Sequence, residues 1–229
     1  MTRRNVFITG GTGYIGRLLI PRLLERGHEV RVLVRRGSEG KVPSGCEAVI
    51  GNPLDASSFA DRVRSSDTFV QLVGVPHPSP TKAAEFQSID LASVRASVSA
   101  AAGAGVKHFV YVSVAQPSPV MKAYQAVRAE GESMIRDSGL AATILRPWYV
   151  LGPGHRWPYL LKPMYWLLES IPATRDTARR LGLVTLEEMV AALVHSVESP
   201  ADGIQVLDVP SIRSSASVTL TEIAAPRTV

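Results

Sequence analysis

Thr9-Gly10-Gly11-Thr12-Gly13-Tyr14-Ile15-Gly16 is the stretch that decides the fold. It follows an apolar run and precedes an amphipathic run that ends at Gly27, so we expect a glycine turn between a strand and a helix. Gly10 permits the tight turn, Gly13 lets a pyrophosphate approach the backbone, and Gly16 allows the helix to pack closely on the strand. The start of the helix would direct unpaired backbone N–H groups at the phosphates.

Short apolar strands alternate with amphipathic helices along the rest of the chain. We predict strands at residues 5–9, 29–34, 48–50, 68–73, 108–113, 142–145 and 204–209, and helices at 14–26, 57–64, 82–102, 121–137 and 185–198. This alternation predicts an α/β fold with a doubly wound parallel sheet, the Rossmann fold. We expect one domain over residues 1–210, with 148–183 as an irregular substrate-side insertion and 211–229 as a loose C-terminal tail.

The composition excludes several classes of protein. With 229 residues, 45% of them hydrophobic and 20% charged, the chain is neither disordered nor fibrous. The single cysteine, Cys46, cannot form an internal disulfide or a thiolate zinc site, and no other residues have metal-ligand spacing, so no metal is predicted.

The net charge of +5 comes from scattered arginines, which favour a solvated surface over nucleic-acid binding. The sequence starts without an apolar signal region and has no run long enough to span a membrane, so a cytoplasmic protein is expected.

Beyond the glycine turn, further motifs carry a family resemblance. Together with it, Gly51-Asn52-Pro53-Leu54-Asp55, Phe109-Val110-Tyr111-Val112-Ser113 and Ile144-Leu145-Arg146-Pro147 resemble motifs of the extended and atypical short-chain dehydrogenase/reductase superfamily. The overall pattern is most similar to NmrA-like and epimerase-like NAD(P)-binding proteins. The resemblance implies a dinucleotide site that includes Thr12, Tyr14 and Ile15 in the turn. It also implies that Asn52 contacts the adenine, Pro53 flanks it, Val73 and Gly74 line the ribose–nicotinamide channel, and Pro147 belongs to the same site.

The end of the second strand decides between the two nicotinamide cofactors. An NAD site usually has an acidic residue there, which accepts from the ribose 2′-hydroxyl. This strand ends in Arg35 and Arg36, and no acid follows before Glu39. Two guanidinium groups would pair with a 2′-phosphate, whereas beside a diol they would stay unpaired. The sequence therefore favours NADP(H) over NAD(H), and the alternative is a pair of solvated arginines at a strand end.

The superfamily carries out proton transfer with a serine and a Tyr-x-x-x-Lys pair. The resemblance assigns the serine to Ser113 and the pair to Tyr124 and Arg128, which are four residues apart and share a helix face. Arginine in place of lysine keeps the positive charge but is bulkier and not interchangeable with it. The alternative is that Tyr124 and Arg128 lie on the helix surface, with Arg128 paired to Glu132.

The substrate side is predicted in the aromatic segment after the sixth strand. Trp148, His155 and Trp157 are the candidate substrate residues, and an aromatic pocket would suit a hydrophobic carbonyl, alcohol or quinone. His77 is a second histidine that could donate to a substrate carbonyl. The same aromatic residues could instead form a small accessory core or a docking patch.

Three functions fit this sequence. The first is an NADP(H)-dependent oxidoreductase acting on a small hydrophobic substrate. The second is a non-catalytic, NmrA-like NADP sensor that regulates a protein partner, and the third is an assembly protein like the dehydrogenase-like accessory subunit of respiratory complex I. The expected partner is therefore a small molecule, another protein or a second copy of the chain in a homo-oligomer, with no nucleic acid.

Overall fold

The protein is described by a computed structural model over residues 2–153 and 180–215. Seven parallel strands form one sheet in the order β3-β2-β1-β4-β5-β6-β9. Their bounds are β1 Asn5–Thr9, β2 Glu29–Val34, β3 Glu47–Ile50, β4 Thr68–Gln71, β5 His108–Val112, β6 Ala142–Leu145 and β9 Ile204–Leu207. This is the predicted doubly wound Rossmann sheet, and the prediction is confirmed.

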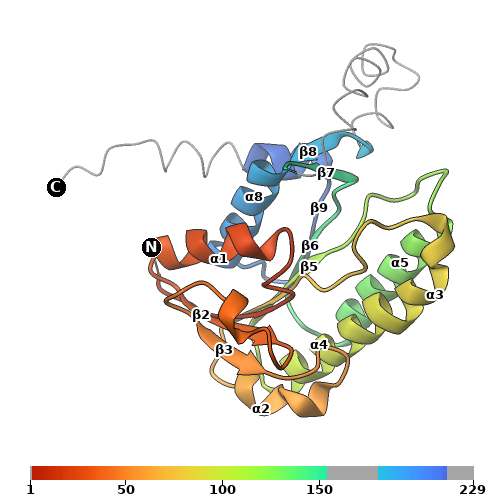
Figure 1. Ribbon diagram of the computed structural model, residues 1–229. Helices are drawn as coiled ribbons and strands as arrows, with labels where there is room; N and C mark the ends of the chain where they lie inside the picture. Colours follow the sequence, from red (N-terminus) through yellow and green to blue (C-terminus); the bar gives the residue numbers. More distant parts are fainter. Residues whose placement is uncertain (1, 154–179, 216–229) are drawn as a thin grey trace, which may run out of the picture.

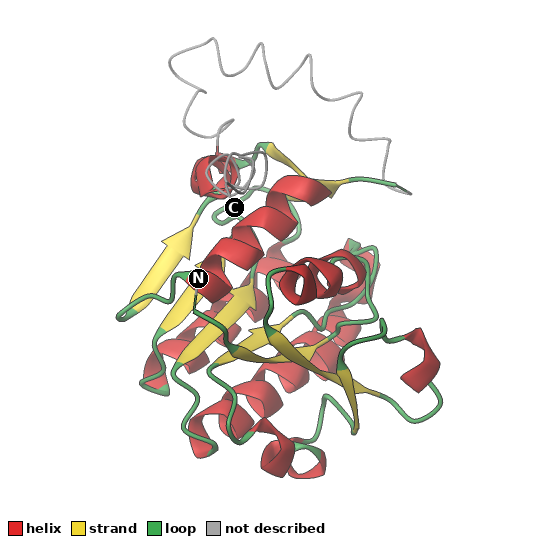
Figure 2. Ribbon diagram, turned by 90° about the vertical axis from the view of Figure 1, so that its left-hand side faces the viewer, coloured by secondary structure: helices red, strands yellow, loops and turns green. Residues whose placement is uncertain are grey.

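Helices cover both faces of the sheet (Figures 1 and 2). The helices α1 (Gly16–Glu25) and α8 (Leu186–Glu198) lie on one face, and α2 (Ala60–Val63), α4 (Ala92–Gly103) and α5 (Lys122–Asp137) lie on the other. Alternate residues of the central strands supply the two cores: Val6 and Ile8 of β1 pack toward α1 and α8, and Phe7 packs toward α2 and α4. Residues of β1 and β4 pair directly, and the chain winds outward from them in opposite directions. The carboxyl ends of β1 and β4 therefore form the switch point where such sheets bind ligands.

The segment predicted as one helix over residues 82–102 is divided. A 3₁₀ turn (η3, Pro80–Lys82) and a short helix (α3, Ala83–Glu85) precede a π-helical segment (η4, Phe86–Leu91), which leads into α4. The other predicted helix that changes is 57–64, which is a 3₁₀ turn (η2, Ala56–Ser58) followed by the single turn of α2. A further 3₁₀ turn, η1, spans Glu39–Lys41.

The C-terminal third adds two features that the sequence pattern did not predict. A two-stranded parallel sheet joins β7 (Tyr149–Leu151) to β8 (Leu183–Thr185) at the two ends of the predicted insertion. Residues 209–215 are helical, so the start of the predicted loose tail at 211 is wrong. The physical reason is burial, because Val209 and Ile212 are fully buried in the core beneath α8. Among the described residues, no helix has the length and hydropathy needed to cross a membrane.

Candidate functional site

Glycines in the β1–α1 turn are required by close contacts. Gly10 has a φ of +75°, and a β-carbon there would lie 2.7 Å from the carbonyl carbon of Leu72, at the end of β4. A β-carbon on Gly16 would lie 2.4 Å from the carbonyl oxygen of Gly11, so α1 packs directly against the turn. Gly11 is itself required, because its β-carbon would lie 2.5 Å from Cγ1 of Val32. The turn thus fits the space between three strands only with these glycines.

The N-terminus of α1 is suited to an anion. Its N-cap residue, Ile15, provides no side-chain hydrogen bond, and the first turn of the helix holds no acidic residue. Gly13 is exposed at the tip of the turn, and the Arg17 side chain lies beside it, with Nε 3.4 Å from the Gly13 carbonyl oxygen. Unpaired N–H groups, a helix dipole and a nearby guanidinium all favour a phosphate at this position. The pyrophosphate of a dinucleotide fits these residues.

Tyr14 connects the turn to the segment that follows β7, on the face of the sheet that α1 and α8 cover. A β-carbon on Gly152, just after β7, would lie 2.2 Å from the Tyr14 hydroxyl. The residue predicted to belong to the cofactor turn therefore also packs beneath the segment that leads to the predicted substrate side.

Arg35 and Arg36 follow β2 directly, and both are exposed. The chain turns immediately after them, at Gly37, which has a φ of +82°. Hydrogen bonds from the backbone N–H groups of Glu39 and Gly37, with the nearby charge of Arg36, lower the pKa of Glu39. Because β1 and β2 are parallel, the carboxyl end of β2, where Arg35 and Arg36 lie, is at the same end of the strands as the glycine turn.

The predicted adenine loop after β3 is ordered by its own hydrogen bonds. Ser58 Oγ accepts from the Asn52 backbone N–H at 2.9 Å, and Asn52 Oδ1 accepts from the Leu54 N–H at 3.1 Å. Asn52 is exposed and Pro53 half-buried. The side-chain oxygen of Asn52 thus accepts a hydrogen bond within the loop, and the residue lies at the surface.

Val73 and Gly74 form the turn after β4, and this turn meets α5. A β-carbon on Gly74 would lie 2.4 Å from Nη2 of Arg128 and 3.2 Å from Oδ1 of Asp90. The residues predicted to line the nicotinamide channel and those predicted to form the reacting centre are therefore adjacent. The glycine is needed here because the guanidinium fills the space that a side chain would take.

The structure brings Tyr124 and Arg128 together. The central carbon of the Arg128 guanidinium lies 5.0 Å from the centroid of the Tyr124 ring, and this half-buried ring also packs on Phe86, with centroids 4.9 Å apart. Arg128 is 5% exposed, so the surface alternative for it is wrong. The alternative pairing of Arg128 with Glu132 is also wrong, because Arg128 pairs with Asp90.

Arg128 lies in a buried polar cluster. Its Nη1 donates to the carbonyl oxygen of Val112 at 2.9 Å and lies 3.4 Å from the Tyr111 hydroxyl, and its Nη2 donates to Asp90 Oδ1 at 2.5 Å. Burial raises the pKa of Asp90, while Arg128 and the N–H of Val75 oppose that change. Burial also raises the pKa of Tyr111 to about 12, so this phenol stays protonated.

Ser113 is directed elsewhere. Its hydroxyl is buried and donates to Glu132 Oε1 at 2.7 Å. The same carboxylate accepts from Gln116 Nε2 at 2.9 Å and from both Nε and Nη2 of Arg146, at 2.9 and 2.5 Å. Burial raises the pKa of Glu132, but the hydrogen bonds from Arg146 and Ser113 outweigh it and hold the pKa below its ordinary value. The donor of Ser113 is therefore occupied by an ionised carboxylate.

Fewer of the predicted substrate residues can be placed. Trp148 is half-buried and meets Tyr149 edge-on, with ring centroids 5.5 Å apart. Pro147 is buried. His155 and Trp157 lie outside the described residues, and His77 is exposed on the loop after β4.

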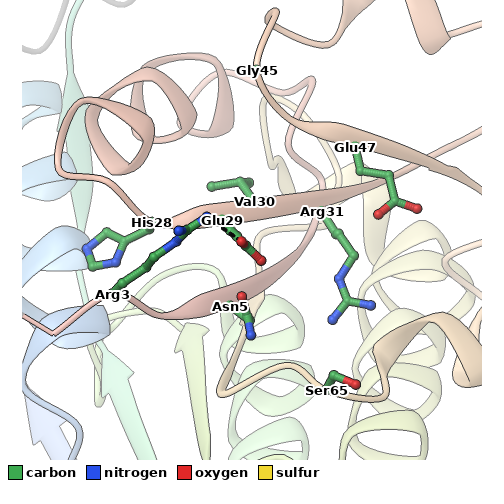
Figure 3. A pocket seen from close by; sticks show the side chains of 9 residues that line it. All are labelled: Arg3, Asn5, His28, Glu29, Val30, Arg31, Gly45, Glu47 and Ser65. Atoms are coloured by element: carbon green, nitrogen blue, oxygen red, sulfur yellow. Dashed lines mark hydrogen bonds and ion pairs between the residues drawn. The ribbon is translucent and has the colours of Figure 1, made fainter.

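A hollow of about 450 Å³ lies at the opposite end of the strands from the glycine turn, between the amino ends of β1 and β2. Its charged groups already have partners: Arg3 points toward Glu29 and pairs with it (Figure 3), and Arg31 donates to Ser66 Oγ at 2.9 Å. The carboxyl ends of the strands, where the glycine turn and Arg128 lie, therefore remain the candidate site. No group of three metal-ligating side chains occurs within residues 2–153 and 180–215.

Asp90 and Glu132 are the site residues that the sequence interpretation did not assign. Asp90 stands between the apolar residues Ile89 and Leu91, and this was the available signal. Glu132 follows Arg128 by four residues and looked like its surface partner.

Comparisons with known proteins identify a family for this chain and solved structures with the same fold. The sequence profile of the family described as NAD(P)H-binding matches residues 10–156, more than half of the chain. The chain is 28% identical over 201 residues to ceramide reductase of Caulobacter vibrioides, across 87% of this chain and 62% of that protein. It is 25% identical over 168 residues to the 4-hydroxy-2-methyl-3-oxo-4-farnesyl-3,4-dihydroquinoline-1-oxide ketoreductase of Stigmatella aurantiaca, across 64% of this chain and 50% of that protein. The chain thus spans between half and two thirds of the length of these two relatives.

A solved structure shares the fold. The enzyme WbmH of Bordetella bronchiseptica, in complex with NAD⁺, superimposes with a TM-score of 0.69 at 19% sequence identity, across 100% of this chain and 84% of that one.

Proposed function

Because the chain belongs to the NAD(P)H-binding family, within the atypical short-chain dehydrogenase/reductase group that its motifs resemble, we propose that it is an NADP(H)-dependent oxidoreductase. Its substrate would be a hydrophobic carbonyl, alcohol or quinone. The observation that carries the proposal is the position of Tyr124 against the Arg128 guanidinium, which itself lies against Gly74 at the switch point of the sheet. A phenol beside a cation, next to a dinucleotide turn, is suited to exchange a proton with a substrate oxygen.

The residues that would hold the cofactor come from the carboxyl ends of β1, β2, β3 and β4. The N–H groups at the start of α1 would bind the pyrophosphate, Asn52 and Pro53 the adenine, and Gly74 the region near the nicotinamide. Two exposed guanidinium groups, those of Arg35 and Arg36, support a 2′-phosphate and hence NADP(H).

In the reaction, the bound nicotinamide supplies the hydride chemistry. Tyr124 donates a proton to the carbonyl oxygen during reduction and accepts it back during oxidation. Arg128 keeps a positive charge beside the phenol, and Val112 and Asp90 fix its orientation. Ser113, which the resemblance assigns to the carbonyl, donates instead to Glu132, so we assign it a supporting position and place proton transfer on Tyr124.

A hydrophobic substrate is supported by two kinds of observation. Trp148 and Tyr149 place aromatic rings at the start of the segment that follows β6. The two relatives named above are, by their names, reductases of a ceramide and of a farnesylated quinoline. An apolar surface beside the reacting centre would bind such compounds by burial of their hydrocarbon.

The experiment that tests the proposal is NADPH oxidation with a panel of hydrophobic ketones and quinones, by the wild type and by Tyr124→Phe. We expect Tyr124→Phe to reduce turnover at least about 100-fold while NADPH still binds. Equal turnover by both proteins would remove Tyr124 from the mechanism.

A non-catalytic NADP-binding regulator is the second candidate. The observation that favours it is the Ser113–Glu132 hydrogen bond, which occupies the donor that a carbonyl would need. This candidate expects tight NADPH binding and no turnover with any member of the panel. The assembly role, a homo-oligomer and a cytoplasmic location stay predictions from the sequence.

A further inference from the structure

Asp90 is a buried carboxylate in an irregular part of the helix layer. Its side chain is fully buried, and it lies in the π-helical segment η4, a type of irregularity that is frequent at functional sites. Oδ2 accepts from the N–H of Val75 at 2.9 Å, and Oδ1 accepts from Arg128. One carboxylate therefore joins the turn after β4 to the guanidinium on α5.

The contacts continue from Asp90 to the phenol. Arg128 makes its ion pair with Asp90 and lies over the Tyr124 ring, so the three side chains form a series from acid to cation to phenol. Arg128 cannot turn away easily, because Val112 accepts a second hydrogen bond from it and Gly74 lies against Nη2. The negative charge of Asp90 is thus held at a fixed place behind the positive charge that Tyr124 meets.

We propose that Asp90 is a positioning residue that orients Arg128 against Tyr124 and offsets part of its positive charge. The inference rests on the proposed function, because Tyr124 is taken as the proton donor. A full guanidinium charge beside the ring would favour the phenolate, and a phenolate cannot donate a proton. The Asp90 carboxylate, as the counter-ion of Arg128, offsets part of that charge, which suits reduction.

Other groups near the ring do not replace Asp90 in this role. Phe86 of η4 packs on the ring and carries no charge. Tyr111 of β5 interacts electrostatically with the cluster but keeps its proton, since burial raises its pKa to about 12. Lys122 and Glu85, the charged residues near the starts of α5 and η4, are exposed, so solvent screens them.

The test is the pH dependence of carbonyl reduction in three proteins. In Asp90→Asn the guanidinium loses its counter-ion, and the rate should begin to fall at lower pH than in the wild type. In Asp90→Asn/Arg128→Gln both charges are removed, and the rate should begin to fall at higher pH than in the wild type or in Asp90→Asn. An alkaline limb at the same pH in all three proteins would overturn the proposal.

Removing one partner of a buried pair can unfold a protein, so a matched control is needed. Glu198→Gln breaks a different carboxylate–arginine pair, a part-buried one with Arg26, between α8 and the residue that follows α1. It should lower stability without moving the alkaline limb. If Asp90→Asn does not fold, the double variant, which leaves no unpaired charge, still tests the ion pair as a whole: an alkaline limb at the same pH as in the wild type would overturn the proposal.

A second readout does not need turnover. The ionisation of Tyr124 can be followed by NMR of ¹³Cζ-labelled tyrosine in protein without cofactor, with the signal identified by its loss in Tyr124→Phe. The same order of the three proteins is expected. If the three proteins show this order but none of them turns over a substrate, the proposed reaction is refuted and the role of Asp90 stands. If they turn over substrate without this order, the role of Asp90 is refuted and the proposed reaction stands.

Discussion

A β-carbon on Gly74 would lie 2.4 Å from Nη2 of Arg128. The turn after β4 and the middle of α5 are therefore in direct contact, and the absence of a side chain at position 74 sets the position of the guanidinium. Because hydrogen bonds to Asp90 and Val112 hold Arg128, the guanidinium cannot move aside at low cost.

Gly74→Ala should displace Arg128. We expect the free energy of unfolding to fall by about 1–3 kcal/mol, as for overpacking in a core, and turnover to fall with it. The matched control is Gly103→Ala at the end of α4, where a β-carbon would meet nothing within 4 Å. Urea unfolding of both variants checks this, and an equal effect at the two glycines would contradict the account.

His108 should make stability depend on pH. Burial lowers the pKa of His108 to about 4, and the charge of Arg4 adds to the effect. The unfolded chain therefore takes up a proton below about pH 6.5 that the folded chain refuses, so stability is complete above that pH and falls toward pH 4. The loss amounts to at most about 3 kcal/mol over this interval.

His108→Gln, which does not titrate, should flatten this dependence. Urea unfolding of both proteins at pH 7 and pH 5 measures this dependence. The interval suits His108 because the pKa values of Glu132 and Glu198 are lowered, so the stability that these two carboxylates contribute is lost only at more acidic pH. A loss between pH 7 and pH 5 that is the same in the variant and the wild type would assign the dependence to other groups.

Ser113→Ala separates a catalytic serine from a supporting one. Since the hydroxyl donates to Glu132, we expect a loss of about 1 kcal/mol in stability and less than about a tenfold loss of turnover. Steady-state kinetics beside Tyr124→Phe tests this. A loss as large as that of Tyr124→Phe would mean that Ser113 turns from Glu132 to the substrate when the ternary complex forms.

The sheet was predictable because each strand is a short apolar run between breakers. Phe7, Phe69 and Phe109 occupy paired positions of β1, β4 and β5 and pack on one another beneath α2 and α4, with ring centroids 5.3 and 5.2 Å apart. Asn5–Thr9, Glu29–Val34 and Ala142–Leu145 match their predicted bounds. The π-helical segment was not predictable, because its side chains follow the same pattern as an α-helix.

The buried ion pairs were not predictable for a different reason. Asp90 and Arg128 are separated by 38 positions, and the sequence pattern does not show which acid meets which arginine. The helix at 209–215 did leave a signal. Asp208 Oδ1 accepts from the Ser211 N–H at 3.0 Å, and an acidic cap followed by Pro210 is typical of a helix start.

The measurement that tests the central claim most directly is calorimetric titration with NAD⁺, NADH, NADP⁺ and NADPH at one salt concentration. We predict that NADPH binds at least about tenfold more tightly than NADH, because each charge-assisted hydrogen bond to the 2′-phosphate contributes about 1.5–3 kcal/mol. Arg35→Ala/Arg36→Ala should remove that difference and leave NADH binding unchanged, and Arg95→Ala, at an exposed position of α4, should leave both unchanged. Equal affinity for NADH and NADPH in the wild type would contradict the cofactor assignment, and no binding of any of the four nucleotides would contradict the account as a whole.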